Sequence, residues 1–154
     1  MAHHIKSPQK NNSGPVIMWT SLVLASLGIL DASYLLVYKL TNNNAMCLGN
    51  GGCHDVNFSP YSQIAGIPVS LFGLAAYLVM AVILLLEGRL KIVKDNGPLA
   101  IFGISLAGTV FTGYLTWIEL YVIHKLCPFC VATAIIITLI FILAVIRLVK
   151  QTAF

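Results

Sequence analysis

Charged residues are scarce in this sequence. Asp, Glu, Lys and Arg together make up only 9% of its 154 residues, while 58% are hydrophobic. A soluble domain usually carries about 25% charged residues, so the composition excludes an ordinary water-soluble protein. The solvent of most of this chain is therefore expected to be lipid.

Four apolar windows are long enough to cross a bilayer as helices, which takes about 20 residues each. They are Val16 to Tyr38, Pro68 to Leu86, Pro98 to Ile123 and Pro128 to Ile146. The first window exceeds the core of a signal peptide and is read as an uncleaved anchor. The sequence thus predicts an all-α integral membrane protein, a four-transmembrane-helix bundle over residues 16–150. A polar N-terminus, 1–15, precedes this single domain and a short tail, 151–154, follows it.

Basic residues are divided unevenly between the two ends of this expected bundle. Four crossings place both termini and the loop 87–97 on one side, and the loops 39–67 and 124–127 on the other. Seven of the nine Lys and Arg residues fall on the first side. By the positive-inside rule this side is cytoplasmic. The net charge of +4 is then an orientation signal, with no nucleic-acid patch to explain.

All four cysteines fall on the opposite side. Cys47 and Cys53 lie in the first outer loop, and Cys127 and Cys130 lie at the outer end of the fourth window. Disulfides form and persist in the bacterial periplasm or an organelle lumen. We expect a multi-pass protein of the bacterial inner membrane with cytoplasmic termini and periplasmic cysteines. The sequence alone leaves all three disulfide pairings open.

Cys127-Pro-Phe-Cys130 is a C-x-x-C motif at a predicted helix start, where Pro128 suits the first helical position. The unpaired N–H groups and the dipole of a helix N-terminus stabilise a thiolate, and Lys125 and His124 would add to this effect. The motif therefore predicts a reactive pair. The alternative is a structural disulfide or two buried thiols.

The other pair belongs to the segment Cys47-Leu-Gly-Asn-Gly-Gly-Cys53, whose three glycines leave the backbone loose. A mobile pair suits a shuttle that collects electrons from an outside protein by thiol–disulfide exchange. Two alternatives remain, a structural staple and a zinc site with all four cysteines as ligands. Five residues between Cys47 and Cys53 exceed the usual spacing of zinc ligands, so we expect no metal.

Three segments together resemble the vitamin K epoxide reductase family, in particular its small bacterial members without a fused thioredoxin-like domain. The first is the loop pair of cysteines. The others run from Ser59 to Gly73 and from Tyr114 to Cys130, and the resemblance extends over about Trp19 to Ile146. It implies a four-helix bundle around a quinone, with a short amphipathic cap helix in the first outer loop, for which we take Phe58 to Ile67.

The resemblance also implies a role for each cysteine. Cys47 would exchange with the partner protein, and Cys53 would form an interim disulfide with Cys127. Cys130 would face and reduce the quinone, with Ser70, Phe72 and Phe129 beside it. A serine at position 70 is equally explained by a backbone hydrogen bond at a helix start.

Two positions differ from the animal enzymes, which carry an asparagine and a tyrosine where this chain has Val69 and Ala134. These differences remove polar groups that would hold a naphthoquinone and argue against epoxide reduction. The implied function is disulfide formation, with ubiquinone or menaquinone as the acceptor. The implied partner is a separate periplasmic DsbA-like oxidase of thioredoxin fold, and the chain is expected to be a monomer.

Two acidic residues lie inside the apolar windows, Asp31 in the first and Glu119 in the third. A carboxylate inside a bilayer costs about 2.5–3.5 kcal/mol and therefore faces protein or water. Either residue could relay the protons that quinone reduction takes up. The alternative is a hydrogen-bonded contact, for Asp31 with Tyr34 or a neighbouring helix.

A second hypothesis for the whole chain belongs to another functional class: a non-enzymatic tetraspan membrane protein with structural disulfides or a zinc site.

Overall fold

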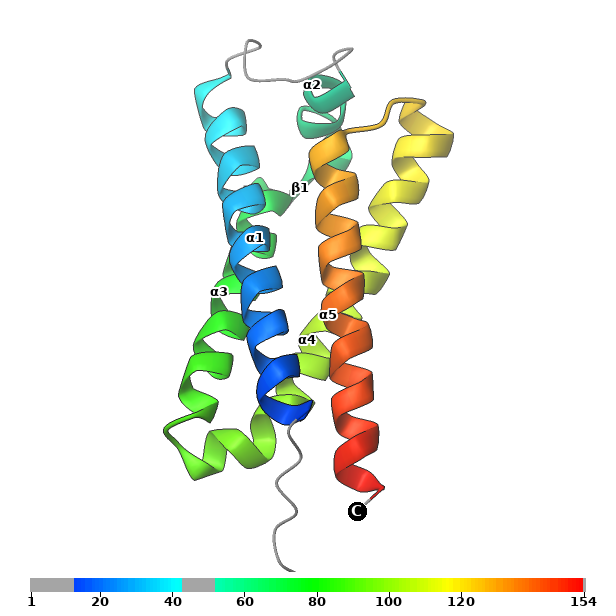
Figure 1. Cartoon of the computed structure of the whole chain (residues 1–154). Coiled ribbons are helices and arrows are strands. Elements are labelled where there is room, and N and C mark those ends of the chain that lie inside the picture. Colours follow the sequence, from blue (N-terminus) through cyan, green and yellow to red (C-terminus); the bar gives the residue numbers. More distant parts are fainter. Residues whose placement is uncertain (1–12, 43–51, 154) are drawn as a thin grey trace, which may run out of the picture.

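The computed structural model of this chain describes residues 13–42 and 52–153. Four long helices run between its two ends (Figure 1). They are α1 (Ser13–Thr41), α3 (Val69–Glu87), α4 (Lys91–Ile118) and α5 (Pro128–Thr152). All four are long and apolar enough to cross a membrane, which confirms the predicted fold class.

The helices pack as a bundle in which α1 lies against α3 and α5, and α4 lies against α5 and α3. Their inward faces form one apolar core that includes Met80, Leu84 and Ile140. Gly28 lets α1 approach α3, because a Cβ atom there would overlap the ring of Tyr77. A small residue at a helix crossing is a common way of packing membrane helices closely.

The loop predicted over residues 87–97 is largely helical. Helix α4 begins at Lys91 and carries Pro98 in its interior. Figure 1 shows the first turns of α4 lying across the lower end of the bundle before the helix turns upward. The third apolar window begins at Pro98, and a proline is well tolerated in the first turn of a helix, where its missing N–H group would have no partner. Here Pro98 lies inside the helix, which is tolerated where a helix bends.

The first outer loop contains a short helix, but not at the predicted position. Helix α2 covers Gly52–Asn57, whereas residues 58–67 form a 3-10 turn, η2 (Pro60–Ser62), and a small hairpin. The strands of the hairpin are β1 (Gln63–Ile64) and β2 (Ile67–Pro68). Their turn needs positive φ at Ala65 and Gly66, of 53° and 82°. Proline at 60 and 68 and this turn prevent a continuous cap helix over Phe58 to Ile67.

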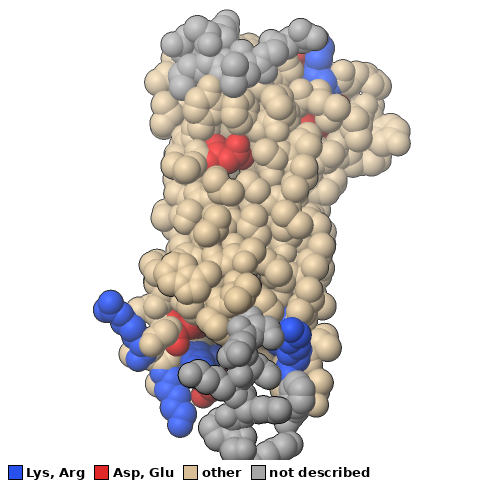
Figure 2. Space-filling view, in the orientation of Figure 1, with Lys and Arg blue, Asp and Glu red and all other residues tan. Residues whose placement is uncertain are grey.

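The two ends of the bundle differ in charge. Both described ends of the chain lie at the lower end in Figure 1, and Figure 2 shows most blue side chains gathered there, below a wide uncharged belt. At that end, Arg147 of α5 lies 2.8 Å from the buried carboxylate of Glu87 on α3. The bundle therefore exposes an apolar girdle, and most of its described basic residues lie at one end, outside this girdle.

Candidate functional site

The C-x-x-C motif lies at the upper end of α5. Cys127 caps the helix with extended backbone angles, and Pro128 follows at the first helical position, as the sequence predicts. Cys127 is completely buried, and Cys130 is partly buried one turn further along. No disulfide joins Cys127 and Cys130 in the structure. The helix start thus brings the two sulfurs onto one face.

Hydrogen bonds set the acidity of Cys127. The Cys130 thiol donates to the Cys127 sulfur, and backbone N–H groups of the first helical turn, at Cys130 and Phe129, point to it as well. These contacts lower the pKa of Cys127 to about 7, with a smaller contribution from the side chain of Cys53. Lys125, expected to contribute, lies instead 3.8 Å from Asp55 in a half-exposed ion pair. Cys127 is therefore substantially a thiolate at neutral pH.

The loop cysteine Cys53 approaches this pair from α2. It is 2% exposed, and its side chain forms a hydrogen bond with Cys127. The approach depends on Gly52, because a Cβ atom there would overlap the carbonyl oxygen of Leu126. The remaining predicted cysteine, Cys47, lies outside the described residues. Sulfur-to-sulfur exchange requires close approach, and the packing of α2 provides it for Cys53 and Cys127.

Helix α4 ends beside the cysteines in an unusual turn. It passes into a π-helical segment, η3 (Glu119–Ile123), which ends at His124 in the left-handed conformation with φ of 56°. The Lys125 N–H donates to the Glu119 carbonyl across this turn. The turn reverses the chain so that Cys127 comes to lie over the side chain of Glu119. The Cys127 N–H donates to that carboxylate at 3.4 Å.

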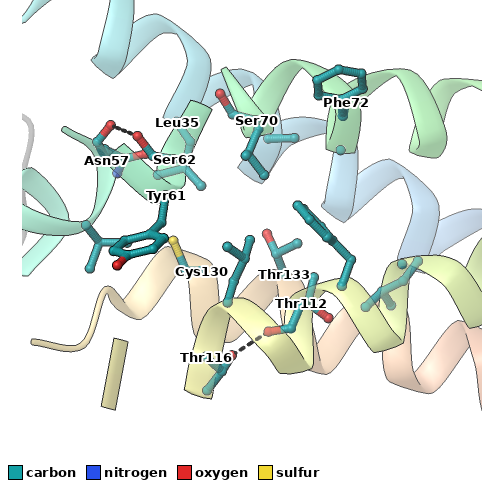
Figure 3. Close-up of a pocket in the computed structure, with 18 of the residues that line it drawn as sticks. Leu35, Asn57, Tyr61, Ser62, Ser70, Phe72, Thr112, Thr116, Cys130 and Thr133 are labelled. Carbon is teal, nitrogen blue, oxygen red and sulfur yellow. Dashed lines mark hydrogen bonds between the residues drawn. The ribbon is translucent and has the colours of Figure 1, made fainter. Parts of the chain in front are cut away.

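A cavity of about 400 Å³ opens next to Cys130. Its walls come from all four long helices and from the segment between α2 and α3, and they are mostly apolar. Figure 3 shows the Cys130 sulfur at the end of the cavity where Tyr61 lies, with Ser70 and Phe72 on the α3 side. Cavities of this size and character hold small organic ligands.

Asn57, Ser59, Tyr61 and Ser62 form one wall of the cavity, which we call its roof. Lys39 of α1 holds this roof in place. Its ammonium donates to the Asn57 carbonyl at 2.8 Å, to the Ser62 hydroxyl at 2.7 Å and to the Ser62 carbonyl at 3.3 Å. Asn57 in turn donates from its side chain to the Cys53 carbonyl at 2.9 Å. The same polar contacts therefore fix both the roof and the helix that carries Cys53.

Of the residues predicted to bind quinone, the structure places Ser70, Phe72 and Cys130 in the cavity lining. Phe129 is absent from the described lining, and its ring packs against that of Tyr34 in a tilted arrangement, with centroids 4.7 Å apart. Neighbouring residues of a helix point about 100° apart, so Phe129 and Cys130 project in different directions from α5, and a quinone contact of Phe129 stays a prediction. The Ser70 hydroxyl is buried and has no hydrogen-bond partner within the described part of the chain.

The two acidic residues proposed for proton relay differ in position. Glu119 lines the cavity and is 2% exposed. Asp31 lies one contact further away: Thr133, which lines the cavity, donates its hydroxyl to the Asp31 carboxylate. The Tyr77 hydroxyl also reaches Thr133, donating to its carbonyl at 3.2 Å. The expected partner of Asp31 on another helix is therefore Thr133.

Sequence reasoning missed Lys39 and Thr133 as residues of this site. Thr133 follows Cys130 by three positions, and residues with that spacing share a helix face, so the sequence held a usable signal for it. Lys39 is one of only two basic residues that the sequence places at the outer end of the bundle, which was a weaker indication of a role in the site. Nothing in the sequence specifies that it holds the roof.

Comparisons with known proteins show to which family the chain belongs. The sequence model of the vitamin K epoxide reductase family matches residues 19–145, which include α3 and α4, most of α1 and α5, and all four cysteines. A similar protein is thiol-disulfide oxidoreductase LTO1 of Arabidopsis thaliana, 33% identical over 123 residues. The match covers 76% of this chain and 33% of the plant protein. The chain therefore spans about a third of the length of that relative.

Proposed function

The chain belongs to the vitamin K epoxide reductase family, and we propose that it is a membrane thiol:quinone oxidoreductase that generates disulfides. The observation that carries the proposal is the position of Cys130. Its thiol is hydrogen-bonded to Cys127, and the same residue lines the apolar cavity. The side chain of Cys53 also forms a hydrogen bond with Cys127. Electrons that enter by thiol exchange at Cys127 can therefore leave at the cavity.

The proposed relay starts with two thiol–disulfide exchanges. A reduced thiol pair of a partner protein first reduces a Cys47–Cys53 disulfide. The Cys53 thiolate then attacks Cys127 in a Cys127–Cys130 disulfide, which forms the interim Cys53–Cys127 bond and releases Cys130 as a thiolate. Attack of Cys47 on Cys53 restores the loop disulfide and leaves Cys127 and Cys130 reduced.

Oxidation of this reduced pair completes the cycle. Two electrons and two protons pass to a quinone, whose two carbonyl oxygens become hydroxyls, and the Cys127–Cys130 disulfide re-forms. A thiol reacts as its thiolate, and the lowered pKa of Cys127 makes it a good leaving and attacking group near neutral pH. The energy comes from the potential difference between the thiol pair and the quinone, about 1.4 kcal/mol for every 30 mV.

The cavity suits a quinone ring. A volume of about 400 Å³ is within the range of small-molecule sites. The apolar walls match the ring and its isoprenoid tail, and the buried Ser70 hydroxyl can rotate to donate to a ring carbonyl. Position 69, which also lines the cavity, is valine here, so the polar group of the animal enzymes is missing from the wall. These features favour ubiquinone or menaquinone over an epoxide substrate.

We propose a bacterial inner membrane location with the C-x-x-C end in the periplasm. Five of the seven described Lys and Arg residues lie at the opposite end, which favours a cytoplasmic position for that end. The proposed donor is a DsbA-like protein of thioredoxin fold, because such a protein, when reduced, presents an exposed cysteine thiolate that could attack Cys47 in the Cys47–Cys53 disulfide. We propose that the chain acts as a monomer, since each step uses cysteines of a single bundle.

The test is quinone reduction by the purified protein in detergent, with a reduced thioredoxin-fold oxidase or a small dithiol as donor. We expect turnover in the wild type and none in Cys130→Ala with either donor. Cys47→Ala should lose turnover with the protein donor and keep it with the small dithiol, which can reach the inner pair directly. Failure of the wild type with every quinone and donor would refute the proposal and favour structural cysteines.

A further inference from the structure

Glu119 is a buried carboxylic acid between the cysteine pair and the cavity. It is 2% exposed and lines the cavity. Its carboxylate accepts a hydrogen bond from the Cys127 N–H at 3.4 Å and another from the Cys130 thiol. Ionisable groups at membrane depth are costly and are usually functional. The position of this side chain therefore calls for a role beyond packing.

The contacts of Cys130 indicate what that role is. Its thiol is hydrogen-bonded to the Cys127 sulfur and to the Glu119 carboxylate, yet a thiol has only one proton to donate. That proton is therefore shared between a sulfur that will form the disulfide and a carboxylate that faces the cavity. Oxidation of the pair must remove this proton, and the carboxylate is the acceptor already in contact with it.

The backbone supports a specific placement of Glu119. It is the first residue of the π-helical segment, and π-turns within helices occur frequently at functional sites. The wider turn and the left-handed His124 bring the chain back over the carboxylate. A regular α-helix would carry the chain onward along its axis instead of returning Cys127 to the acid.

The other carboxylic acids of the chain do not occupy comparable positions. They are Asp31, Asp55, Glu87 and Asp95. Asp31 is separated from the cavity by Thr133, and Asp55 lies near Lys125 in a half-exposed pair. Glu87 is paired with Arg147 at the far end of the bundle. Glu119 thus combines contact with Cys130 and access to the cavity.

We propose that Glu119 is a catalytic acid–base that takes the proton of the Cys130 thiol and passes it to a quinone carbonyl oxygen. The inference rests on the proposed function. As the Cys127–Cys130 bond forms, the two electrons of the pair go to the quinone. One of its oxygens receives the Cys130 proton through Glu119. The other receives a proton from water, because Cys127 has already lost its own proton as a thiolate.

The experiment compares wild type with Glu119→Gln, which keeps an oxygen that can accept from the Cys127 N–H but cannot carry a proton. General acid–base catalysis contributes about 100-fold to 10,000-fold, so we expect at least about a tenfold loss in single-turnover quinone reduction by the pre-reduced protein. Transfer of electrons from a small dithiol to the Cys127–Cys130 disulfide should change less than about threefold, since no proton passes to the quinone in that step.

The matched control is Glu87→Gln, which removes another buried carboxylate far from the cavity and should leave quinone reduction unchanged. A Glu119→Gln protein that reduces quinone within tenfold of the wild-type rate overturns the inference. The outcome differs from failure of the proposed function, in which the wild type itself reduces no quinone.

A measurement on the wild type covers the case in which Glu119→Gln does not fold. Infrared difference spectra between the oxidised and reduced protein should contain a carboxyl C=O band that shifts in heavy water. The band should persist in Asp31→Asn, which removes the other acid near the site. Absence of any such band, or its loss in Asp31→Asn, overturns the inference.

Discussion

The acidity of Cys127 offers a direct test of the site, because the largest single contribution to its lowered pKa comes from one neighbouring side chain. The Cys130 thiol is the largest cause that lowers the pKa of Cys127 from 9.0 to about 7. At pH 7 about half of Cys127 is thiolate, whereas a pKa of 9 would leave about 1%. Cys130→Ala should therefore shift the midpoint of Cys127 alkylation upward, toward 9 or beyond, since burial of the thiol opposes its ionisation.

The change in rate is smaller than the change in thiolate fraction. A thiolate of higher pKa is more nucleophilic, and a Brønsted slope of about 0.4–0.5 over two pKa units raises the rate constant of the thiolate by a factor of about 6 to 10. The roughly 50-fold loss of thiolate then becomes a net slowing of about 5-fold to 8-fold at pH 7. The midpoint of the pH profile is thus the more sensitive readout.

The assay is alkylation of reduced protein in detergent from pH 5 to 10, with the Cys127 peptide followed by mass spectrometry. In the wild type, reactivity should be lost as the pH falls through about 7, because protonation removes the thiolate. Cys130→Ser is the matched control: its hydroxyl can still donate to the Cys127 sulfur, so the midpoint should stay closer to 7. An unchanged midpoint near 7 in Cys130→Ala would refute the assignment of the effect to the Cys130 thiol.

Three further predictions concern the walls and the approach of the loop. Ser70→Ala should raise the KM for quinone by about fivefold to tenfold, equivalent to one hydrogen bond of about 1 kcal/mol, and an unchanged KM in steady-state kinetics would count against a contact with the ring. Lys39→Met should lower the thermal unfolding midpoint and raise the quinone KM, because three hydrogen bonds to the roof are lost; a variant unchanged in both would contradict this role. Gly52→Ala should slow electron transfer from the protein donor but not from a small dithiol, since its Cβ meets the Leu126 carbonyl, while Gly103→Ala, whose Cβ meets nothing within 4 Å, is the control. Equal effects of the two glycine variants with the protein donor would show that the close approach of α2 is unimportant.

The fold was predictable because the membrane imposes strong constraints on a chain. Backbone groups in lipid must bond internally, so each long apolar window had to be a helix. The windows ending near Tyr38 and Leu86 fall within one to three residues of helix ends in the structure. The start of α4 was missed because apolarity marks the lipid core and not the helix, which continues into the polar turns from Lys91.

The candidate site was predictable only in part. The C-x-x-C motif carries its own geometry, since Pro128 and the helix start determine where Cys127 and Cys130 lie. Contacts between distant segments were less accessible. The pairing of Asp31 with Thr133 joins residues 102 positions apart, and hydropathy contains no register between α1 and α5 that would specify it.

Cys127 lies between the two reactions of the proposed relay, thiol–disulfide exchange and quinone reduction. It is completely buried, forms hydrogen bonds with both Cys53 and Cys130, and is absent from the described lining of the cavity. In the proposed relay, electrons from a thiol of the partner protein would therefore reach the cavity through Cys53 and Cys127, and a quinone in the cavity would meet Cys130, which is the cysteine of the described lining. Direct reaction between a quinone and Cys53 would bypass the inner pair, and the absence of Cys53 from the described cavity lining disfavours that route. The C-x-x-C motif would thus carry electrons from the partner thiol to the quinone and also keep these two reactants apart.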